Sequence, residues 1–319
     1  MAATRALLEA RGRIVRAVRG WFESEGFLEV STPARVRSPG QEVHLDAIPA
    51  GQSDGDARWL ITSPEYHLKR LVASGLPRIF EICKCWRAEE NGPHHRTEFT
   101  MVEWYRANAP LELLAADCEA LVGVAFQAAG RDPIALGVGP PFARTTVSAL
   151  FARHAGFSLT GAETAAELRN AAEAAGVAVG AATEWDDVFY QTFLDRIEPE
   201  LSKSAPTFVF DWPAPLGALA RPHPRDARVV ERFELYAGGL ELANAFGELT
   251  DPVEQRRRFE EETRIRAGRG KAVYPIDEAL LAALPQVPPT AGIALGLDRL
   301  IMLATGAPDI SEVQAFSDA

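Results

Sequence analysis

The sequence has few cysteines and no long apolar run, and both absences narrow the class of protein. Its 319 residues include three cysteines, Cys83, Cys85 and Cys118, too few for a disulfide framework. The spacing of Cys83 and Cys85 is not that of a zinc knuckle, so we expect both thiols on one face of a strand as small buried groups. No run of about 18 uncharged apolar residues is present, which excludes a transmembrane helix.

The chain also lacks the excess of basic residues that nucleic-acid-binding proteins use to displace counterions. Lys and Arg number 33 against 44 Asp and Glu, for a formal net charge of −11. This balance argues against nucleic acid as the main partner, although a local basic patch stays possible. The N-terminal residues have the spacing of an amphipathic helix rather than a cleavable signal peptide, which predicts a cytoplasmic protein.

Strands that arrive in hairpins, with helices grouped between them, predict an α+β fold with an antiparallel sheet. Between Ser38 and Asp56 the composition is rich in Pro, Gly and Asp and predicts a loop. Ser63, Pro64 and Glu65 have the order of an N-cap, a first helical position and a first-turn acid. The predicted strands are 27–33, 59–62, 79–86, 99–105, 207–210 and 232–245. The predicted helices are the N-terminal one, ending near residue 25, then 63–71, 112–129, 165–175, 252–269 and one opening at 299.

The first candidate for chemistry is the end of the strand 79–86, where Arg87 and Glu89 follow. Side chains two positions apart on a strand share one face. An arginine there can clamp a phosphate with two hydrogen bonds, and a carboxylate can accept one from an adenine amine. The alternative is a surface ion pair on a hairpin. His94 and His95 lie in the following loop, and without further ligands at metal spacing we expect a solvated or substrate-contacting loop.

Two carboxylates form the second candidate. Glu234 and Glu241 flank a predicted tight turn that contains Gly238 and Gly239. Folding of that hairpin would bring the two carboxylates together, and hard oxygen ligands suit Mg²⁺ on a nucleotide's phosphates. A solvated carboxylate pair is the alternative, and the apolar residues between them make it less favoured.

The third candidate is the series Gly292, Ala294, Gly296 and Arg299. Small residues on a strand that leads into a helix permit close approach of a flat ligand. Arg299 at the start of the helix would then cover a phosphate. The series is not a dinucleotide fingerprint, because the third glycine and the βαβ context are missing.

Taken together, these pieces of the chain occur in the order of the three motifs of the class II aminoacyl-tRNA synthetases and resemble them. Motif 1 resembles 20–33, which ends in the proline that this family uses at its dimer interface. Motif 2 resembles Arg87-x-Glu89 followed by His95-x-x-x-Phe99, and motif 3 resembles 292–299. The segments 62–65, 98–105 and 241–251 are similar to the lysyl-tRNA synthetase group.

A lysyl-tRNA synthetase would carry an anticodon-binding domain before motif 1, where only about twenty residues stand here. The chain is therefore more similar to the truncated paralogues, the elongation factor P–(R)-β-lysine ligases. The resemblance implies a single catalytic domain over 1–319 with a helical insertion at about 111–206 and no tRNA partner. It also implies a homodimer that uses ATP and Mg²⁺, activates (R)-β-lysine or lysine and transfers it to elongation factor P.

The resemblance implies a role for each matching residue. Arg87 and Arg299 would be catalytic and would bind ATP, Arg299 at the γ-phosphate end, while Phe99 would stack on adenine. Further contacts to ATP would come from Ala88, Glu89, Arg96, Glu241, Leu242 and Gly296. Glu234 and Glu241 would hold Mg²⁺. The amino acid would be surrounded by Ser63, Pro64, Glu65, Tyr105, Asn244, Glu248 and Ala294.

Some positions depart from the family pattern. Ala88 stands in place of an asparagine, Arg96 and Thr97 in place of Asn-Pro, and Ala245 in place of a glycine. Ala294 stands where lysyl-tRNA synthetases usually have glycine, and its methyl group accompanies a preference for β-lysine. Two other functions stay open at this point: activation of α-lysine for another acceptor, and a regulatory paralogue without catalysis.

Overall fold

The computed structural model describes residues 4–180 and 184–316 and divides the chain into two compact units. Unit 1 comprises Met1–Asp132 and Leu249–Ala319, and unit 2 comprises Pro133–Glu248. Residues 1–3 of the predicted N-terminal helix lie outside the described residues. None of the helices in the described ranges combines the length and the apolar character that a membrane span needs.

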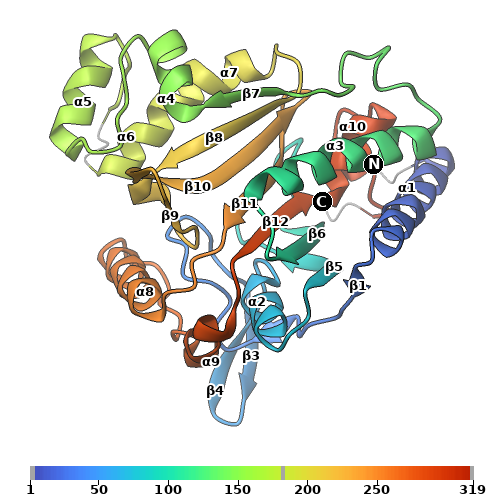
Figure 1. Ribbon diagram of the computed structural model, residues 1–319, viewed down its shortest axis with the longest axis horizontal. Coiled ribbons are helices and arrows are strands. Elements are labelled where there is room, and N and C mark those ends of the chain that lie inside the picture. The colour runs from blue at the N-terminus through green and yellow to red at the C-terminus, as the bar shows by residue number, and fades with distance from the viewer. Residues whose placement is uncertain (1–3, 181–183, 317–319) are drawn as a thin grey trace. The chain divides into compact units, whose positions relative to one another are not determined.

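Unit 1 is built on an antiparallel sheet in the order β5-β6-β12, with β1 added in parallel beside β5 (Figure 1). Its strands are β1 (Leu28–Glu29), β5 (Arg78–Trp86), β6 (Glu98–Ala107) and β12 (Thr290–Gly296). Its helices are α1 (Arg5–Ser24), α2 (Glu65–Ala73), α3 (Leu111–Ala129), α8 (Pro252–Gly268), α9 (Glu278–Ala283) and α10 (Leu297–Thr305), with 3₁₀ turns at Leu284–Gln286 and Ile310–Glu312.

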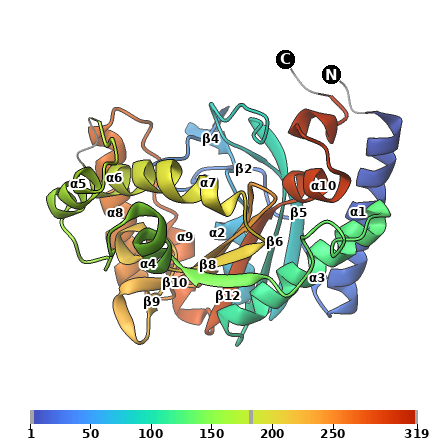
Figure 2. The same cartoon turned by 90° about the horizontal axis from the view of Figure 1, so that it is seen from above.

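One face of this sheet is covered by α1, α3 and α10, which lie side by side in both views (Figures 1 and 2). Helix α1 buries Ile14, Val18 and Phe22 at four-residue spacing, as an amphipathic helix should. The Phe22 ring stacks on Phe80 of β5 with centroids 4.4 Å apart. On the opposite face, Cys85 and Met101 pack with Val36 and Ile61, and Ala294 is partly exposed.

A small second sheet in unit 1 corrects the prediction of a loop over 38–56. Strands β2 (Arg35–Val36), β4 (Asp56–Leu60) and β3 (Pro49–Ser53) pair antiparallel. Asp54 and Gly55 both have positive φ, the backbone of a tight two-residue hairpin turn. The Asp-Gly pair was thus a strand-turn signal inside a segment whose overall composition indicates a loop.

Other predicted elements in unit 1 have different limits from those expected. The strand predicted over 27–33 pairs only through Leu28–Glu29, and the Val30 amide then donates to the Phe80 carbonyl (2.9 Å). Pro33 has no N–H to continue the ladder. Helix α2 begins at Glu65 with Pro64 rather than Ser63 as N-cap, although the Ser63 hydroxyl still accepts from the Glu65 amide (3.4 Å).

Unit 2 contains an antiparallel strand run β11-β10-β8, with β7 parallel to β8 and β9 paired to β10. Its strands are β7 (Ala143–Thr146), β8 (Thr207–Pro213), β9 (Pro222–His223), β10 (Asp226–Ala237) and β11 (Leu240–Gly247). Its helices are α4 (Val147–Leu150), α5 (Ala165–Ala174), α6 (Trp185–Thr192) and α7 (Glu198–Leu201), with π-helical turns at Phe151–Ala155 and Phe193–Ile197 and a 3₁₀ turn at Ala214–Leu216.

Aromatic side chains make the core between these helices and strands. Phe189 of α6 stacks on Phe151 with centroids 5.1 Å apart and packs against Trp212 of β8 at 5.9 Å. These contacts anchor the helices to one face of β8 and β10. The predicted α+β architecture with a mostly antiparallel sheet is confirmed.

Candidate active site

The strand register of unit 1 collects several predicted residues on the face of its sheet opposite α1, α3 and α10. Directly paired residues in neighbouring strands share a face. Glu103 of β6 pairs with Ala294 of β12, and Met101 pairs with Gly296. Ala294 and Gly296 are partly exposed although both neighbours of Ala294 are buried. The small residues of 292–296 therefore open this face, as their pattern predicts.

The two thiols lie on the same face, as expected. The Sγ atoms of Cys83 and Cys85 are 3.8 Å apart, and Cys85 is buried while Cys83 is partly exposed. Cys85 pairs with Phe99 on β6 and Cys83 with Met101. Hydrogen bonding to Cys85 and burial raise the pKa of the Cys83 thiol, so both cysteines serve as packing groups beneath the face.

Arg87 lies at the edge of this face and stacks on Phe99. Its guanidinium carbon is 5.1 Å from the centre of the Phe99 ring, within the range of a cation–π contact. The Arg87 amide donates to the Thr97 carbonyl (3.0 Å), and the Ala88 amide donates to the Asp46 carbonyl (2.7 Å). Glu89 follows with a positive φ of 63° and an exposed side chain. The predicted phosphate and adenine residues thus stand together.

Arg299 of α10 contacts the loop that follows β5. Its Nη2 lies 2.6 Å from His95 Nε2, and its Nε donates to the His94 carbonyl (3.2 Å). Arg96 holds the same loop, because its Nη1 donates to the carbonyls of Gly92 (2.6 Å) and His95 (3.0 Å) and its Nη2 to Asp309 (3.2 Å). The predicted role of Arg96 in binding ATP stays a prediction.

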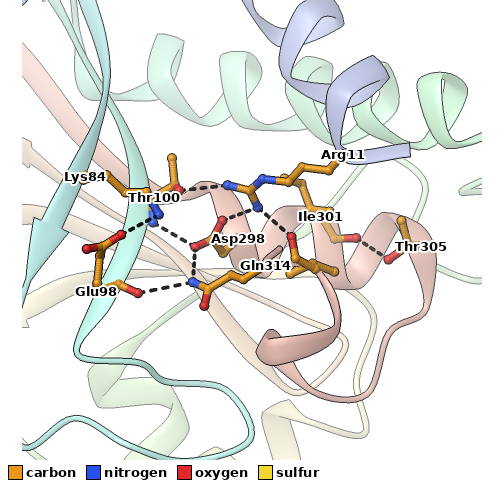
Figure 3. Close-up of polar contacts among 9 residues, drawn as sticks. Arg11, Lys84, Glu98, Thr100, Asp298, Ile301, Thr305 and Gln314 are labelled. Atoms are coloured by element: carbon orange, nitrogen blue, oxygen red, sulfur yellow. Dashed lines mark hydrogen bonds and ion pairs between the residues drawn. The ribbon is translucent and has the colours of Figure 1, made fainter. Parts of the chain in front are cut away.

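A buried carboxylate fixes the start of the helix that carries Arg299 (Figure 3). Asp298 accepts from Arg11 of α1 (2.5 Å), from the Thr100 amide (2.8 Å) and from Gln314 Nε2 (2.9 Å). Arg11 also donates to the Thr100 hydroxyl (2.8 Å). Segments from both ends of the chain and from the central strand therefore position the first turn of α10.

Carboxylates gather beside the residues predicted to bind the amino acid. Glu65 is buried and pairs with Lys69 (2.7 Å) on the next turn of α2. Tyr105 donates its hydroxyl hydrogen to Glu103 (2.6 Å), and Glu103 is buried directly across from Ala294. Glu103 was missed in the sequence, although it stands two positions before Tyr105 and so shares its face of the strand.

Glu42 is a second carboxylate that the sequence did not reveal. Burial raises its pKa, the Glu65 carboxylate adds to this rise, and Arg87 and Lys69 oppose it. The Glu42 carboxylate thus interacts electrostatically with Glu65, which is predicted to bind the amino acid, and with Arg87, which is predicted to bind ATP. A site of this kind favours a cationic group in a ligand.

In unit 2 a β-bulge puts the predicted metal and amide residues on one face of the hairpin. Glu234 pairs with Asn244, and Tyr236 pairs with Glu241. The register shifts between these pairs, so Leu242 is the extra residue of β11. Without it, Glu241 and Asn244, three positions apart, would point to opposite faces. The turn residues Gly238 and Gly239 both have positive φ, which confirms the predicted tight hairpin.

The two carboxylates of this hairpin differ in their surroundings. Glu234 is buried and accepts from Arg232 Nη2 (2.5 Å) and from the Tyr236 hydroxyl (2.6 Å). Burial raises the pKa of Glu234 to about 7, with Arg232 opposing this rise and Glu241 adding to it. Glu241 and Asn244 are partly exposed. Mg²⁺ is commonly held by one or two carboxylates together with substrate phosphates, so this pair fits such an ion.

The remaining predicted residues of unit 2, Glu248 and Leu242, are buried. Glu248 is buried and forms an isolated bridge with Ala220. Leu242 is also buried, so that only its backbone could reach a nucleotide. Among the described residues, no group of three or more His, Cys, Asp and Glu side chains has the arrangement of a metal site. The roles of these residues stay predictions.

Comparisons with known proteins show the family to which the chain belongs. The family described as tRNA synthetases class II (D, K and N) matches residues 2–319. A Pectobacterium atrosepticum protein named elongation factor P–(R)-β-lysine ligase is 41% identical over 315 residues, which cover 96% of this chain and 93% of that protein. Relatives of the same name from Klebsiella pneumoniae and Erwinia tasmaniensis are 40% identical with the same coverage.

This agreement extends over nearly the whole length of both proteins, and it confirms the fold expected from the three motifs. The chain belongs to the family of class II tRNA synthetases and, within it, to the elongation factor P–(R)-β-lysine ligases.

Proposed function

We propose that the protein activates (R)-β-lysine with ATP as an aminoacyl-adenylate and transfers it to a lysine side chain of elongation factor P. The observation that carries this proposal is the identity of about 40% with ligases of that name over 96% of the chain. The contacts around Arg87, Phe99 and Arg299 support it, because they keep together the groups that an ATP-dependent ligase needs.

In the first step, a carboxylate oxygen of the amino acid attacks the α-phosphorus of ATP. The bond from this phosphorus to the bridging oxygen breaks, and pyrophosphate leaves. Arg87 stabilises the charge that spreads over the phosphoryl oxygens, and Arg299 holds the γ-phosphate end. Phe99 supports the adenine ring and Glu89 accepts from its amine. Mg²⁺, held by Glu234 and Glu241, would neutralise charge on the phosphates.

In the second step, the neutral ε-amine of the acceptor lysine attacks the carbonyl carbon of the mixed anhydride. The carbon–oxygen bond to AMP breaks, a proton leaves the attacking nitrogen, and an amide forms. Positioning of amine and anhydride supplies much of the rate in such a transfer. Both substrates of this reaction are cytoplasmic in a bacterium, so we place the enzyme there.

The carboxylates of unit 1 suit the amino groups of the substrate. Glu65 and Glu103 are buried, and each already has a hydrogen-bonded or ion-paired neighbour that fixes its direction. A buried carboxylate is a favourable partner for an ammonium group. We propose that these two residues, with Tyr105 and Ser63, recognise the ammonium groups of β-lysine.

The first test replaces Arg87 by alanine. We expect pyrophosphate exchange that depends on the amino acid to fall by at least about 100-fold, as for the loss of one transition-state donor. Lys84→Ala is the matched control, because Lys84 is exposed on the same strand and pairs with Glu98 at 3.0 Å. Exchange that is unchanged in Arg87→Ala would refute the assigned role.

The acceptor and the amino acid are tested by intact mass spectrometry of elongation factor P after incubation with the protein, ATP and each lysine isomer. We expect a mass increase of one lysyl group with (R)-β-lysine. Modification with α-lysine alone would favour the ligase for α-lysine, and ATP binding without any AMP formation would favour a regulatory protein.

We also propose a homodimer in which the segment around Pro33 lies at the interface. Pro33 is exposed, beside an open hollow lined by Thr32, His67 and Arg70 among others. Sedimentation equilibrium should return twice the mass of one chain, and the mass of a single chain would contradict the dimer.

A further inference from the structure

The side chain of Arg232 lies between two residues with separate predicted roles. Its Nη2 donates to Glu234 (2.5 Å), its Nε donates to Asn244 Oδ1 (3.1 Å), and its Nη1 donates to the Leu216 carbonyl (2.8 Å). Glu234 is a predicted ligand of Mg²⁺, and Asn244 is predicted to contact the amino acid. One guanidinium therefore fixes both side chains.

Aromatic rings hold the guanidinium itself in place. Its central carbon lies 4.2 Å from the ring centre of Trp212 on β8 and 5.7 Å from that of Phe246 on β11. The Tyr190 side chain of α6 forms a further hydrogen bond with it. Only 7% of Arg232 is exposed. The planar guanidinium group cannot rotate between these side chains, so the fold sets the directions of its hydrogen bonds.

Stability alone does not account for such a group. Removing a guanidinium and a carboxylate from water is costly, and an apolar pair of similar size is often as stable. The geometry has a clearer consequence for Asn244. Because Arg232 donates to Asn244 Oδ1, the NH₂ group of Asn244 is directed to donate to a ligand. Such donors suit an oxygen of a carboxylate or a phosphate.

We propose that Arg232 is a positioning residue that couples metal binding to amino-acid binding, by fixing the Glu234 carboxylate and the Asn244 amide in one geometry. This inference rests on the proposed function, in which Glu234 and Glu241 hold the nucleotide's Mg²⁺. Lysine at this position keeps the charge, but all its N–H donors are on one nitrogen at the end of a flexible side chain. It cannot hold Glu234, Asn244 and the Leu216 carbonyl together.

The test measures binding directly as well as activity. Mn²⁺ is titrated by electron paramagnetic resonance into the full chain with a non-hydrolysable ATP analogue. For Arg232→Lys we expect Mn²⁺ to bind at least about 10-fold more weakly and the KM for β-lysine to rise by a similar factor, as for the loss of a charged hydrogen bond. Raising the Mg²⁺ concentration should restore much of the exchange rate.

Arg144→Lys is the matched control. Arg144 also lies over aromatic rings in unit 2, 5.9 Å from Phe208 and 5.8 Å from Phe210, and is exposed. We expect its Mn²⁺ affinity and KM to stay within about twofold of the parent. Thermal unfolding of each variant reports the folded fraction, and Arg232→Met tests the loss of charge.

The outcomes distinguish a failure of this inference from a failure of the proposed function. If Glu241→Gln weakens Mn²⁺ binding and Arg232→Lys does not, the positioning role is wrong and the metal assignment stands. If Glu241→Gln leaves Mn²⁺ binding unchanged, the metal assignment is wrong and the role of Arg232 falls with it. A loss in Arg232→Lys that matches its unfolded fraction and does not respond to added Mg²⁺ also overturns the proposal.

Discussion

The methyl group of Ala294 is the proposed single-residue determinant of isomer choice, on the face of the unit 1 sheet opposite α1, α3 and α10. It is partly exposed and lies in register with the buried Glu103 carboxylate. In the proposed function, an amino acid whose amino group binds Glu103 would pass close to this methyl. One methyl group in a pocket changes discrimination by about 1–3 kcal/mol, or roughly 10- to 200-fold.

Ala294→Gly should therefore relax the choice between lysine isomers. We expect kcat/KM for α-lysine, relative to that for (R)-β-lysine, to rise by about 10-fold. The KM for ATP serves as internal control and should stay within about twofold, because β12 keeps its register. AMP formation with each isomer gives the ratio, and an unchanged ratio would remove Ala294 from the specificity pocket.

Single residues were predictable from the sequence only where a motif marked them. Arg87, Phe99 and Arg299 were found because they stand in the segments that resemble motifs 2 and 3, and the structure brings Arg87 onto Phe99. Arg232 and Glu42 were missed, because their significance depends on partners far away in the chain. Arg232 contacts Leu216, 16 positions away, and no local spacing encodes such a contact.

At the scale of elements, the long strands were predictable and the irregular ones were not. β5 and β6 are nine and ten residues long, are rich in β-branched and aromatic residues, and are delimited by polar loops. The β3–β4 hairpin has a polar, glycine-rich sequence and depends on pairing with β2. The bulge at Leu242 depends on the pairing of β10 with β11. The sequence alone therefore could not predict that Glu241 and Asn244 share a face.

The first turn of α10 is the element on which the placement of Arg299 depends. Asp298 is 1% exposed and accepts from three donors in other segments (Figure 3). Asp298→Asn puts an amide NH₂ among these donors and leaves the Arg11 charge without its carboxylate. Breaking a buried ion pair costs about 3–5 kcal/mol. We expect urea unfolding to show a loss near the lower value and the KM for ATP to rise.

Glu98→Gln provides the comparison for this variant. Glu98 pairs with Lys84 at 3.0 Å within the same network, but both side chains are about half exposed. Such a surface pair contributes at most about 1 kcal/mol. If Asp298→Asn unfolds at the same urea concentration as Glu98→Gln, then Asp298 does not anchor α10.

At the scale of the whole molecule, an excess of acidic groups gives a net charge of −11, and some of these groups lie close together and partly shielded from water. Glu262 on α8 is the clearest case. Burial raises its pKa to about 8, the nearby Glu42 and Glu65 add to the rise, and Arg258 and Arg266 oppose it. The folded protein thus holds a proton that the unfolded chain releases near the ordinary value of 4.5.

The sign of the resulting pH dependence follows from the count of bound protons. Between pH 4.5 and about 8 the folded state binds more protons at Glu262 than the unfolded state does. The contribution of Glu262 to the free energy of unfolding then falls as the pH rises through this interval. Glu262→Gln removes the titrating group and keeps its shape, so the fall should become shallower, by an amount of the order of 1 kcal/mol or more across the interval. Urea unfolding followed by tryptophan fluorescence at a series of pH values measures the slope.

Glu261→Gln is the control on the same helix. Glu261 is exposed, and its hydrogen bond with Arg264 lowers its pKa, so its titration lies below the interval. This variant should keep the parent's slope between about pH 5 and pH 8, the range that separates the titrations of the two carboxyl groups. Equal slopes in Glu262→Gln and in the parent would mean that Glu262 is ionised in the folded protein. The buried carboxylates around α8 would then be compensated by Arg258 and Arg266 and would not weaken the molecule at alkaline pH.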